Sequence, residues 1–448
     1  AVSATPSGSD NPAVLILGAG MAGLGAAHRL REEGASSLIF DKKPFAGGHA
    51  ASFQHGSFLF DDGPHVSFTS DPRIREIFEK SLGGSFERLQ TRVDNYWRGH
   101  FLKHPAPCNL HGLPTDLIVR IVEDFVVAER ERRPSAARNY GDWLRATYGD
   151  TFADAFPAVY GKKYHTASAE QMTTDWLGPR LYRPSLEEVL RGALEKKTPD
   201  VHYVDRFRYP THGGFVAFLR GLIDDSALAL GQEVESVDPS ERRLRFTDGR
   251  ERSYRHLISS LPLPVLIDRL AGAVPEPVRR AAARLACTEC ILVNLGIDRE
   301  DAATGHWTYF YDEDISFARL SAPHLLSPNT VPPGASSLQA EVYYSAKYRP
   351  RTLSPEEHIE PVVRDLVRCG VLREDDRLLH RSASLVPFAN IIFDHGRPAA
   401  LETVLGYLEE VGIESCGRYG RWGYHWTDES FQSGEIAAQN LLDRGSLF

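Results

Sequence analysis

The chain has 448 residues, of which 42% are hydrophobic and 25% are charged, and it carries a formal net charge of −9. This length exceeds what one hydrophobic core usually serves, so we expect at least two structural units. The acidic balance argues against a nucleic-acid partner, and no apolar run approaches the roughly 18 residues that a membrane-spanning helix needs. Five cysteines in so long a chain are typical of a reducing compartment. Residues 1–12 lack the basic start and apolar middle of a signal peptide, so we expect a flexible leader and a cytoplasmic location.

The strongest local pattern opens the folded part of the chain. The stretch AVLILGAGMAGLGAAHRLREEG predicts an apolar strand, a turn containing Gly18, Gly20 and Gly23, and a helix. Glycines in such a turn let a pyrophosphate approach the free N–H groups at the start of the helix. A second predicted strand, SLIF, is followed by Asp41, which is a suitable acceptor for ribose hydroxyl groups. The order of strand, glycines, helix, strand and acid predicts a dinucleotide-binding unit.

Two further glycine turns indicate which dinucleotide is bound. DKKPFAGGHA places Gly47 and Gly48 directly after the ribose acid, and ASFQHGSFLFDDGPH returns the chain to a turn at Gly63. This arrangement resembles the flavin-binding half of the superfamily that contains the amine oxidases, protoporphyrinogen oxidases and UDP-galactopyranose mutases. The resemblance implies an FAD cofactor with the extra glycines lying against it. The sequence has no second GxGxxG motif, so a separate NADPH domain is not expected.

The middle of the chain alternates between helical and strand patterns. Residues 86–205 look helical, and PTDLIVRIVEDFVVAERER has the apolar stripe of an amphipathic helix. Ser185 and Glu188 predict a capping box for a later helix. Residues 206–262 read as strands, with a hairpin around Asp248-Gly249. CILVNLGI and SSLQAEVYYS then predict longer strands, and SFQSGEIAAQNLL predicts a final helix.

These patterns predict an α/β fold with a Rossmann-like FAD-binding domain assembled from separated segments. We assign residues 13–85, 206–262 and 384–448 to that domain. Residues 86–205 are expected to form an inserted helical substrate unit. Residues 263–383 are expected to form an inserted antiparallel-sheet substrate unit.

Four short motifs combine positive charge or imidazole with aromatic rings, and three of them also contain glycine. They are DWLGPRLYRP with Arg180, HWTYFYDEDISFAR with Tyr309 and Arg319 on a predicted hairpin, GPHVSF with His65, and GRYGRWGYHW with Arg418 and Tyr424. Guanidinium groups form charge-assisted, often bidentate bonds to phosphates, and phenols donate hydrogen bonds without adding charge. Together the motifs are therefore suited to holding a diphosphate.

These motifs resemble those of the UDP-galactopyranose mutases, especially the eukaryotic ones, and the similarity runs along most of the chain. The resemblance implies catalytic and phosphate-binding roles for Arg180, Arg319, Tyr309 and Tyr424, a place for His65 beside the flavin, and flavin contacts for Arg418 and Ser430. It implies a small-molecule substrate, a nucleoside-diphosphate sugar whose pyranose and furanose forms are interconverted. In that reaction N5 of reduced FAD is the nucleophile at the anomeric carbon, and no net oxidation occurs.

Two stretches depart from the mutase pattern. KHPAPCNL has His104, Ala106 and Pro107 where the family carries a tyrosine, a phenylalanine and a glutamine that hold the uracil and ribose. Val386-Pro387 stands where the family has a phosphate-binding tyrosine before a proline. We therefore expect a preference for UDP over other nucleoside diphosphates of less than about a hundredfold.

The sequence leaves two other interpretations open. An FAD-dependent oxidase or dehydrogenase of the protoporphyrinogen oxidase or amine oxidase type shares the flavin scaffold, and would have an apolar substrate cage. A flavin-binding protein without turnover is the third interpretation.

Some residues of the motifs are assigned to structural roles. A tryptophan is more often a packing residue than a ligand, so Trp422 and Trp426 are assigned to the core. Cys287-x-x-Cys290 has no second cysteine pair and the histidines show no ligand spacing, so we expect no metal site.

Overall fold

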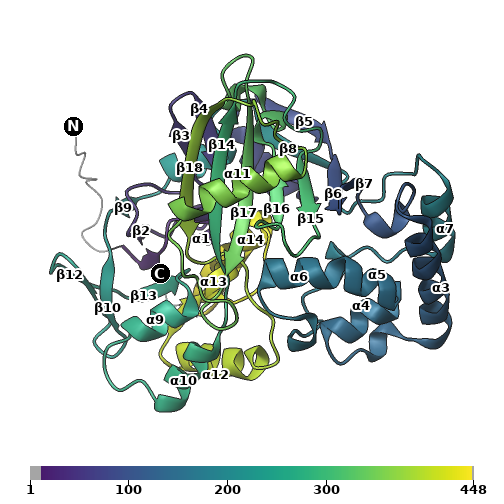
Figure 1. The fold of residues 1–448 in the computed structure, drawn as a ribbon. Coiled ribbons are helices and arrows are strands. Elements are labelled where there is room, and N and C mark those ends of the chain that lie inside the picture. Colours follow the sequence, from purple (N-terminus) through teal and green to yellow (C-terminus); the bar gives the residue numbers. More distant parts are fainter. Residues whose placement is uncertain (1–11, 446–448) are drawn as a thin grey trace.

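The computed structural model describes residues 12–445, and residues 1–11 of the expected leader lie outside them. The first sheet is parallel and has five strands, in the order β19-β13-β1-β2-β9; β2, β9 and β13 are labelled at the left of Figure 1. Its strands are β1 (Val14–Leu17), β2 (Ser37–Asp41), β9 (Leu228–Leu230), β13 (His256–Ser259) and β19 (Ile413–Ser415). These strands come from three distant parts of the chain, so the prediction of a Rossmann-like sheet assembled from separated segments is confirmed.

The helices beside this sheet approach one another closely. All four residues of β1 are buried, as expected for a central strand of a parallel sheet. After the glycine turn, α1 (Met21–Glu32) packs along the predicted final helix, α14 (Thr427–Asp443). Gly25 and Gly434 lie at the contact, where a Cβ atom on either would overlap the backbone of the other helix. The two helices therefore touch backbone to backbone, which holds both ends of the chain on the same sheet.

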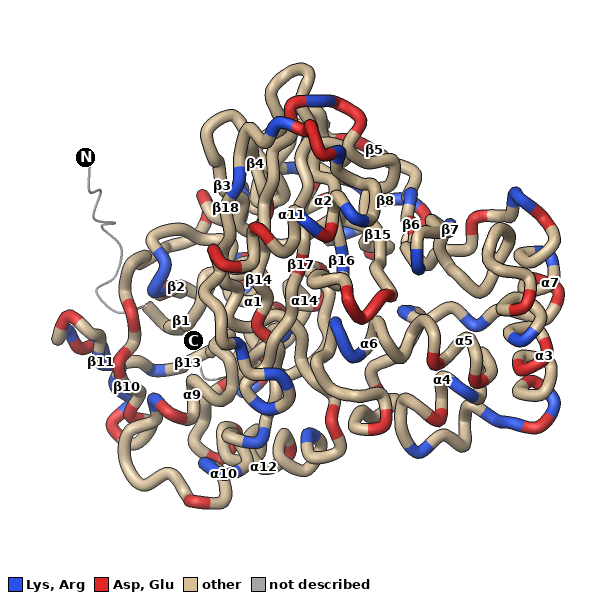
Figure 2. Tube along the Cα trace, viewed as in Figure 1, with Lys and Arg blue, Asp and Glu red and all other residues tan. Residues whose placement is uncertain are grey.

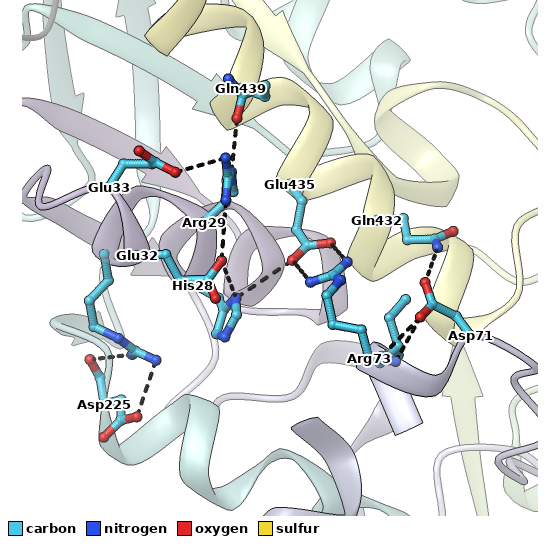
Figure 3. Close-up of polar contacts among 12 residues, drawn as sticks. His28, Arg29, Glu32, Glu33, Asp71, Arg73, Asp225, Gln432, Glu435 and Gln439 are labelled. Carbon is cyan, nitrogen blue, oxygen red and sulfur yellow. Dashed lines mark hydrogen bonds and ion pairs between the residues drawn. The ribbon is translucent and has the colours of Figure 1, made fainter. Parts of the chain in front are cut away.

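A polar network fastens α14 to the neighbouring α2 (Pro72–Lys80) (Figure 3). Glu435 of α14 accepts two hydrogen bonds from the guanidinium group of Arg73, at 2.6 and 2.7 Å. Because Glu435 is only 7% exposed, the charge of Arg73 offsets much of the cost of burying this carboxylate. One turn earlier, Gln432 donates to Asp71 at 3.1 Å. These contacts hold in place a helix whose first turns border the cavity described below.

The second large sheet has seven strands, in the order β18-β14-β17-β16-β15-β6-β7. Neighbouring strands are antiparallel except β15 and β6, which pair in parallel. Its strands are β6 (Val93–Trp97), β7 (His100–Lys103), β14 (Glu289–Ile297), β15 (Trp307–Phe310), β16 (Arg319–Ser321), β17 (Ser336–Tyr344) and β18 (Leu378–Val386). The longer strands predicted from CILVNLGI and SSLQAEVYYS are β14 and β17, and the structure pairs them with each other.

The helical prediction for residues 86–205 is wrong for the first part of that segment. β5 (Phe86–Gln90), β6 and β7 precede its helices. The physical reason is that β6 pairs with β15, more than 200 residues later, and a partner at that distance leaves no local pattern. The helices of the segment are α3 (Thr115–Glu131), α4 (Tyr140–Tyr148), α5 (Asp150–Ala155), α6 (Pro157–His165) and α7 (Leu186–Leu194). The predicted amphipathic helix is α3, and the predicted capping box of Ser185 and Glu188 begins α7.

Smaller elements complete the fold, and the hairpin predicted around Asp248-Gly249 is confirmed between β11 and β12. The remaining strands are β3 (Ser52–His55), β4 (Phe58–Asp61), β8 (Arg206–Pro210), β10 (Val234–Asp238), β11 (Arg243–Phe246) and β12 (Glu251–Ser253). The remaining helices are α8 (Arg220–Asp224), α9 (Leu263–Arg269), α10 (Glu276–Arg284), α11 (Ile359–Arg368), α12 (Arg397–Glu410) and α13 (Gly417–Gly420).

Charged residues of both signs are interspersed over the whole described trace (Figure 2). An anionic ligand would therefore depend on individual arginines rather than on a general positive field. None of the helices within residues 12–445 combines the length and the apolar character needed to cross a bilayer.

Candidate active site

A cavity of about 610 Å³ is lined by residues from the parallel sheet, the seven-stranded sheet and the helical segment. The lining includes all but one of the residues predicted for the site: Gly18, Gly20, Asp41, Gly47, Gly48, Gly63, His65, Arg180, Tyr309, Arg319, Arg418, Tyr424 and Ser430. The exception is Gly23, which packs inside its own turn, where a Cβ atom would overlap the carbonyl oxygen of Gly18. The fold thus gathers these residues from both ends and the middle of the chain around one space.

The glycine turns form a cradle of bare backbone at one side of this cavity. Gly18 has a φ of +99° and Gly48 a φ of +60°, a region that L side chains rarely adopt. A Cβ atom on Gly48 would lie 2.9 Å from the Cα atom of Gly20. The N–H group of Gly47 donates to the carbonyl of Ala19 at 2.8 Å. The two loops therefore meet without side chains between them, directly at the start of α1.

Asp41 completes the cradle at the end of β2. Its Oδ2 accepts a hydrogen bond from the N–H of Ala19, and its Oδ1 accepts one from the N–H of Lys43, each at 2.8 Å. Each carboxylate oxygen keeps a lone pair for a ribose hydroxyl group. The first turn of α1 carries no acidic residue, so its free N–H groups are suited to a pyrophosphate. The residues present therefore fit an FAD molecule.

His65 lines the cavity after the Gly63 turn. Its Nδ1 lies 2.9 Å from the carbonyl oxygen of Gly63, and its ring packs 5.4 Å from that of Phe215. Burial lowers the pKa of His65 to about 4, although the bond to the Gly63 carbonyl opposes the shift. The imidazole is therefore uncharged at neutral pH. Because a carbonyl can only accept, Nδ1 carries the proton and Nε2 is left as an acceptor.

Two arginines approach the ring of Tyr424. The guanidinium carbon of Arg180 and that of Arg418 each lie 4.5 Å from the centroid of this ring. Their hydrogen-bond partners are carbonyl and amide oxygens, such as the carbonyls of Ala389 and His425 for Arg418. Nε of Arg180 is buried without any partner in the described chain. Neither guanidinium group therefore has a carboxylate partner among the described residues, and their positive charge suits an anionic ligand.

Arg319 differs from the other two arginines because its charge is compensated. It lies directly across from Tyr309 on the neighbouring strand, as the hairpin prediction requires. On its other side it faces Glu341 of β17, with Nη2 at 2.8 Å from Oε1 and Nε bonded to Oε2. Glu341 is only 2% exposed. Sequence reasoning missed this residue, although a lone acid in the apolar stretch SSLQAEVYYS was an available signal.

Further phenol and amide groups surround the same region. The hydroxyl of Tyr164 lies 2.8 Å from that of Tyr424 and donates to Oδ1 of Asn390 at 3.2 Å. Burial raises the pKa of Tyr164 well above 10, with the neighbouring Tyr424 adding to the effect, so its phenol stays protonated. Nδ2 of Asn390 is buried without a partner among the described residues. Sequence reasoning missed both residues, although Tyr160 and Tyr164 show the i, i+4 spacing of one helix face.

Of the two tryptophans assigned to the core from the sequence, only one is a core residue. Trp422 is fully buried, as expected for a core residue. Trp426 is not a core residue, because it lies just before α14, lines the cavity and has the Arg180 guanidinium carbon 4.5 Å from its ring centroid. In the KHPAPCNL stretch, His104 lines the cavity, whereas Ala106 and Pro107 are buried outside its lining.

A separate group of His and Glu side chains lies outside the cavity (Figure 3). Ligand atoms of His28, Glu32 and Glu435 lie within 4.8 Å of one another. Both carboxylates already form ion pairs, Glu435 with Arg73 and Glu32 with Arg29. The charges of this cluster are therefore balanced by side chains.

Replacing Gly48 with alanine is expected to weaken FAD binding strongly. The added methyl group would lie 2.9 Å from the Cα atom of Gly20, at a φ that strains any L residue, so the cradle must open. Strain of about 1–3 kcal/mol corresponds to a loss of affinity of up to about a hundredfold. Titration of the FAD-free protein with FAD measures this loss.

Gly406→Ala is the matched control, because a Cβ atom on this residue of α12 meets nothing within 4 Å. It should bind FAD as the wild type does. Equal FAD affinity of the Gly48 and Gly406 variants would contradict the cradle as the cofactor site.

Comparison with known proteins agrees with this geometry. The family model described as flavin containing amine oxidoreductase matches residues 21–442. A crystal structure of reduced UDP-galactopyranose mutase is similar, with a TM-score of 0.90 and 25% identity over 97% of this chain and 96% of that one. A 4,4'-diapolycopene oxygenase of Methylomonas sp. is 32% identical over 350 residues, which are 68% of this chain and 67% of that protein.

A shorter match is to the 4,4'-diapophytoene desaturase (4,4'-diaponeurosporene-forming) of Staphylococcus haemolyticus (strain JCSC1435). It is 38% identical over 74 residues, which are 16% of this chain and only 14% of that enzyme. The family match, by contrast, extends over nearly the whole chain, and the glycine cradle and Asp41 fit the family's cofactor. The chain therefore belongs to the flavin-containing amine oxidoreductase family, in its UDP-galactopyranose mutase-like branch, and its cofactor is FAD.

Proposed function

We propose that this protein is an FAD-dependent mutase that interconverts the pyranose and furanose forms of a nucleoside-diphosphate sugar without net oxidation. The observation that carries the proposal is the uncompensated positive charge of Arg180 and Arg418 around Tyr424, in the same cavity as the FAD cradle. An apolar substrate would leave these guanidinium groups without a counter-charge, whereas a diphosphate supplies one.

The arginine and phenol groups suit a diphosphate that leaves the sugar. Negative charge grows on this group as the bond to the anomeric carbon breaks. Arg180 would donate charge-assisted bonds to it. Tyr164 donates to Asn390, so Tyr424 would donate a hydrogen bond to the diphosphate by turning its hydroxyl proton away from Tyr164. Donors held in place before the reaction stabilise such a transition state most in a site that excludes water. The glycine cradle and Asp41 would hold FAD, which in its reduced form would supply the nucleophile for the anomeric carbon.

Three other predicted residues have environments that suit supporting roles. His65 is uncharged and presents Nε2 as an acceptor, so it would hold a hydroxyl proton of the sugar. Tyr309 accepts from Nε1 of Trp307 at 3.1 Å, so its own proton is free for the substrate. Arg319 is paired with Glu341, so we assign it a diphosphate contact through Nη1.

The decisive experiment incubates the dithionite-reduced, FAD-bound protein with a panel of nucleoside-diphosphate sugars. We expect chromatography to detect a ring-size isomer of at least one of them. The reaction should require reduced flavin, consume no stoichiometric NAD(P)H and release no hydrogen peroxide, because the sugar is neither oxidised nor reduced. UDP-sugars should not be favoured by more than about a hundredfold over the others.

An oxidase or dehydrogenase is the second candidate, favoured by the 32% identity to the diapolycopene oxygenase of Methylomonas sp.. It predicts hydrogen peroxide in proportion to a desaturated or oxygenated product, together with activity that survives replacement of Arg180. That pair of results, in the absence of any sugar isomer, would replace the mutase proposal.

A further inference from the structure

His104, which lines the cavity, is held in one tautomer by a buried amide. Its Nδ1 lies 3.0 Å from Oδ1 of Asn95, which also accepts from the hydroxyl of Tyr311 at 3.1 Å. Nδ2 of Asn95 donates to the carbonyls of Leu102 and Lys103, at 3.5 and 3.3 Å. Because these carbonyls can only accept, the amide orientation is determined. Nδ1 of His104 therefore carries the proton, and Nε2 carries a lone pair.

The lone pair on Nε2 is available to a ligand. The imidazole stays neutral because burial lowers the pKa of His104 well below 6.5, with His202 adding to the effect. Of the two ring nitrogens of His104, only Nδ1 has a hydrogen-bond partner among the described residues. A neutral imidazole with this tautomer is an acceptor, and only an acceptor, at Nε2.

The rings that pack on His104 are aromatic and uncharged. Its ring lies 5.1 Å from that of Tyr309 and 5.1 Å from that of His202, whose ring in turn lies 6.1 Å from that of Trp307. The pKa of His202 is likewise lowered by burial, so it too is neutral at pH 7. This part of the wall suits a flat, uncharged group, in contrast to the arginine region around Tyr424. In a nucleoside-diphosphate sugar, the flat uncharged group is the nucleobase.

We infer that His104 is a specificity-determining residue that accepts, through Nε2, a hydrogen bond from an N–H group of the nucleobase. The inference rests on the proposed function. Ala106 and Pro107 of the same stretch are buried outside the cavity lining, so His104 is the residue of this trio that can reach a ligand. A nucleotide without an N–H group at this place would cover Nε2 without pairing it and would bind more weakly.

The test uses ligand pairs that differ by one donor. ADP has the exocyclic amino group that purine riboside diphosphate lacks, and UDP has the ring N–H that N3-methyl-UDP lacks. Quenching of flavin fluorescence in the FAD-bound protein measures each affinity. In at least one pair the wild type should prefer the N–H-bearing ligand about three- to tenfold.

Three variants test whether Nε2 of His104 causes the preference for the N–H-bearing nucleotide. His104→Phe keeps an aromatic ring without an acceptor, so it should bind both members of the pair equally. His104→Gln keeps an acceptor oxygen and should restore part of the preference. His111→Gln, at an exposed histidine on the same segment, should leave the preference unchanged.

A spectroscopic measurement tests the tautomer independently of affinity. In ¹⁵N NMR of histidine-labelled protein, the His104 signals are assigned by their loss in His104→Gln. Nε2 should be unprotonated in the FAD-bound protein, and its resonance should shift when the preferred nucleotide binds. If His104→Phe does not retain FAD, the ¹⁵N resonance of Nε2 and the nucleotide preference of His104→Gln still test the inference.

Two results would overturn the inference in distinguishable ways. If the wild type and His104→Phe bind all four ligands alike while sugar isomerisation persists, His104 does not read the base and the proposed function stands. If no nucleoside diphosphate binds and no sugar isomer forms, the proposed function fails and this inference fails with it.

Discussion

Turnover of an Arg180→Ala variant is expected to fall about a hundred- to a thousandfold while FAD stays bound. Within residues 12–445 no carboxylate pairs with the guanidinium group and its Nε is buried without a partner, so a leaving diphosphate would be its counter-ion. Losing one preorganised donor of this kind costs about 3–4 kcal/mol in the transition state. Arg180 contacts Trp176, Tyr424 and Trp426 rather than the glycine cradle, so the flavin spectrum should change little.

Steady-state sugar isomerisation, measured beside the flavin absorbance spectrum, tests this expectation. Arg180→Lys keeps the charge but not the planar fork, so it should recover only part of the loss. The exposed Arg421, in the same segment as Tyr424, provides the control, and Arg421→Ala should turn over at nearly the wild-type rate. An Arg180→Ala variant within about threefold of the wild type would remove Arg180 from the catalytic machinery.

An Arg319→Ala variant is expected to lose about 3–5 kcal/mol of unfolding free energy as well as activity. The replacement leaves the carboxylate of Glu341, which is 2% exposed, without its bidentate partner. Urea denaturation at neutral pH with saturating FAD measures the loss. Because stability and activity fall together, Arg319→Lys is the better variant for the diphosphate contact, and it should retain only part of the activity.

The double variant Arg319→Met, Glu341→Leu separates the two effects. Removing both charges also removes their desolvation cost, so most of the stability should return while turnover stays low. Arg381→Ala breaks an exposed ion pair with Glu360 at 2.9 Å and serves as the control, with an expected loss below about 1 kcal/mol. If Arg319→Ala is no less stable than Arg381→Ala, the buried pair does not carry the stability assigned to it here.

Local patterns predicted much of the fold, because they report interactions between residues close in the chain. The amphipathic stripe of α3 and the capping box of Ser185 and Glu188 were both read from the sequence. The strands of residues 93–103 were missed, since β6 takes its place from β15, a partner far away in the chain. Trp426 was misassigned for a related reason: only the entry of the chain into α14 turns this ring toward the cavity.

In the candidate site, too, contacts between residues close in the chain were predicted, and contacts between distant residues were not. The spacing of Tyr309 and Arg319 predicted their pairing across a hairpin, which the structure has. Glu341 reaches Arg319 from the next strand, so its role depends on the register of two strands rather than on any motif. Asn390 and Tyr164 likewise meet only because distant elements pack together.

By itself, the sequence determined the parallel flavin sheet and its cofactor cradle. Glycine acts there through its own backbone, and Asp41 follows directly from the end of β2, so spacing alone carries the information. Only the tertiary structure decided which arginine keeps a free charge and which is neutralised. It also decided the tautomer of His104, because Asn95 reaches this histidine from a neighbouring strand. The physical reason is that charge, tautomer and hydrogen-bond capacity are properties of contacts, and these contacts join residues that only the packed fold brings together.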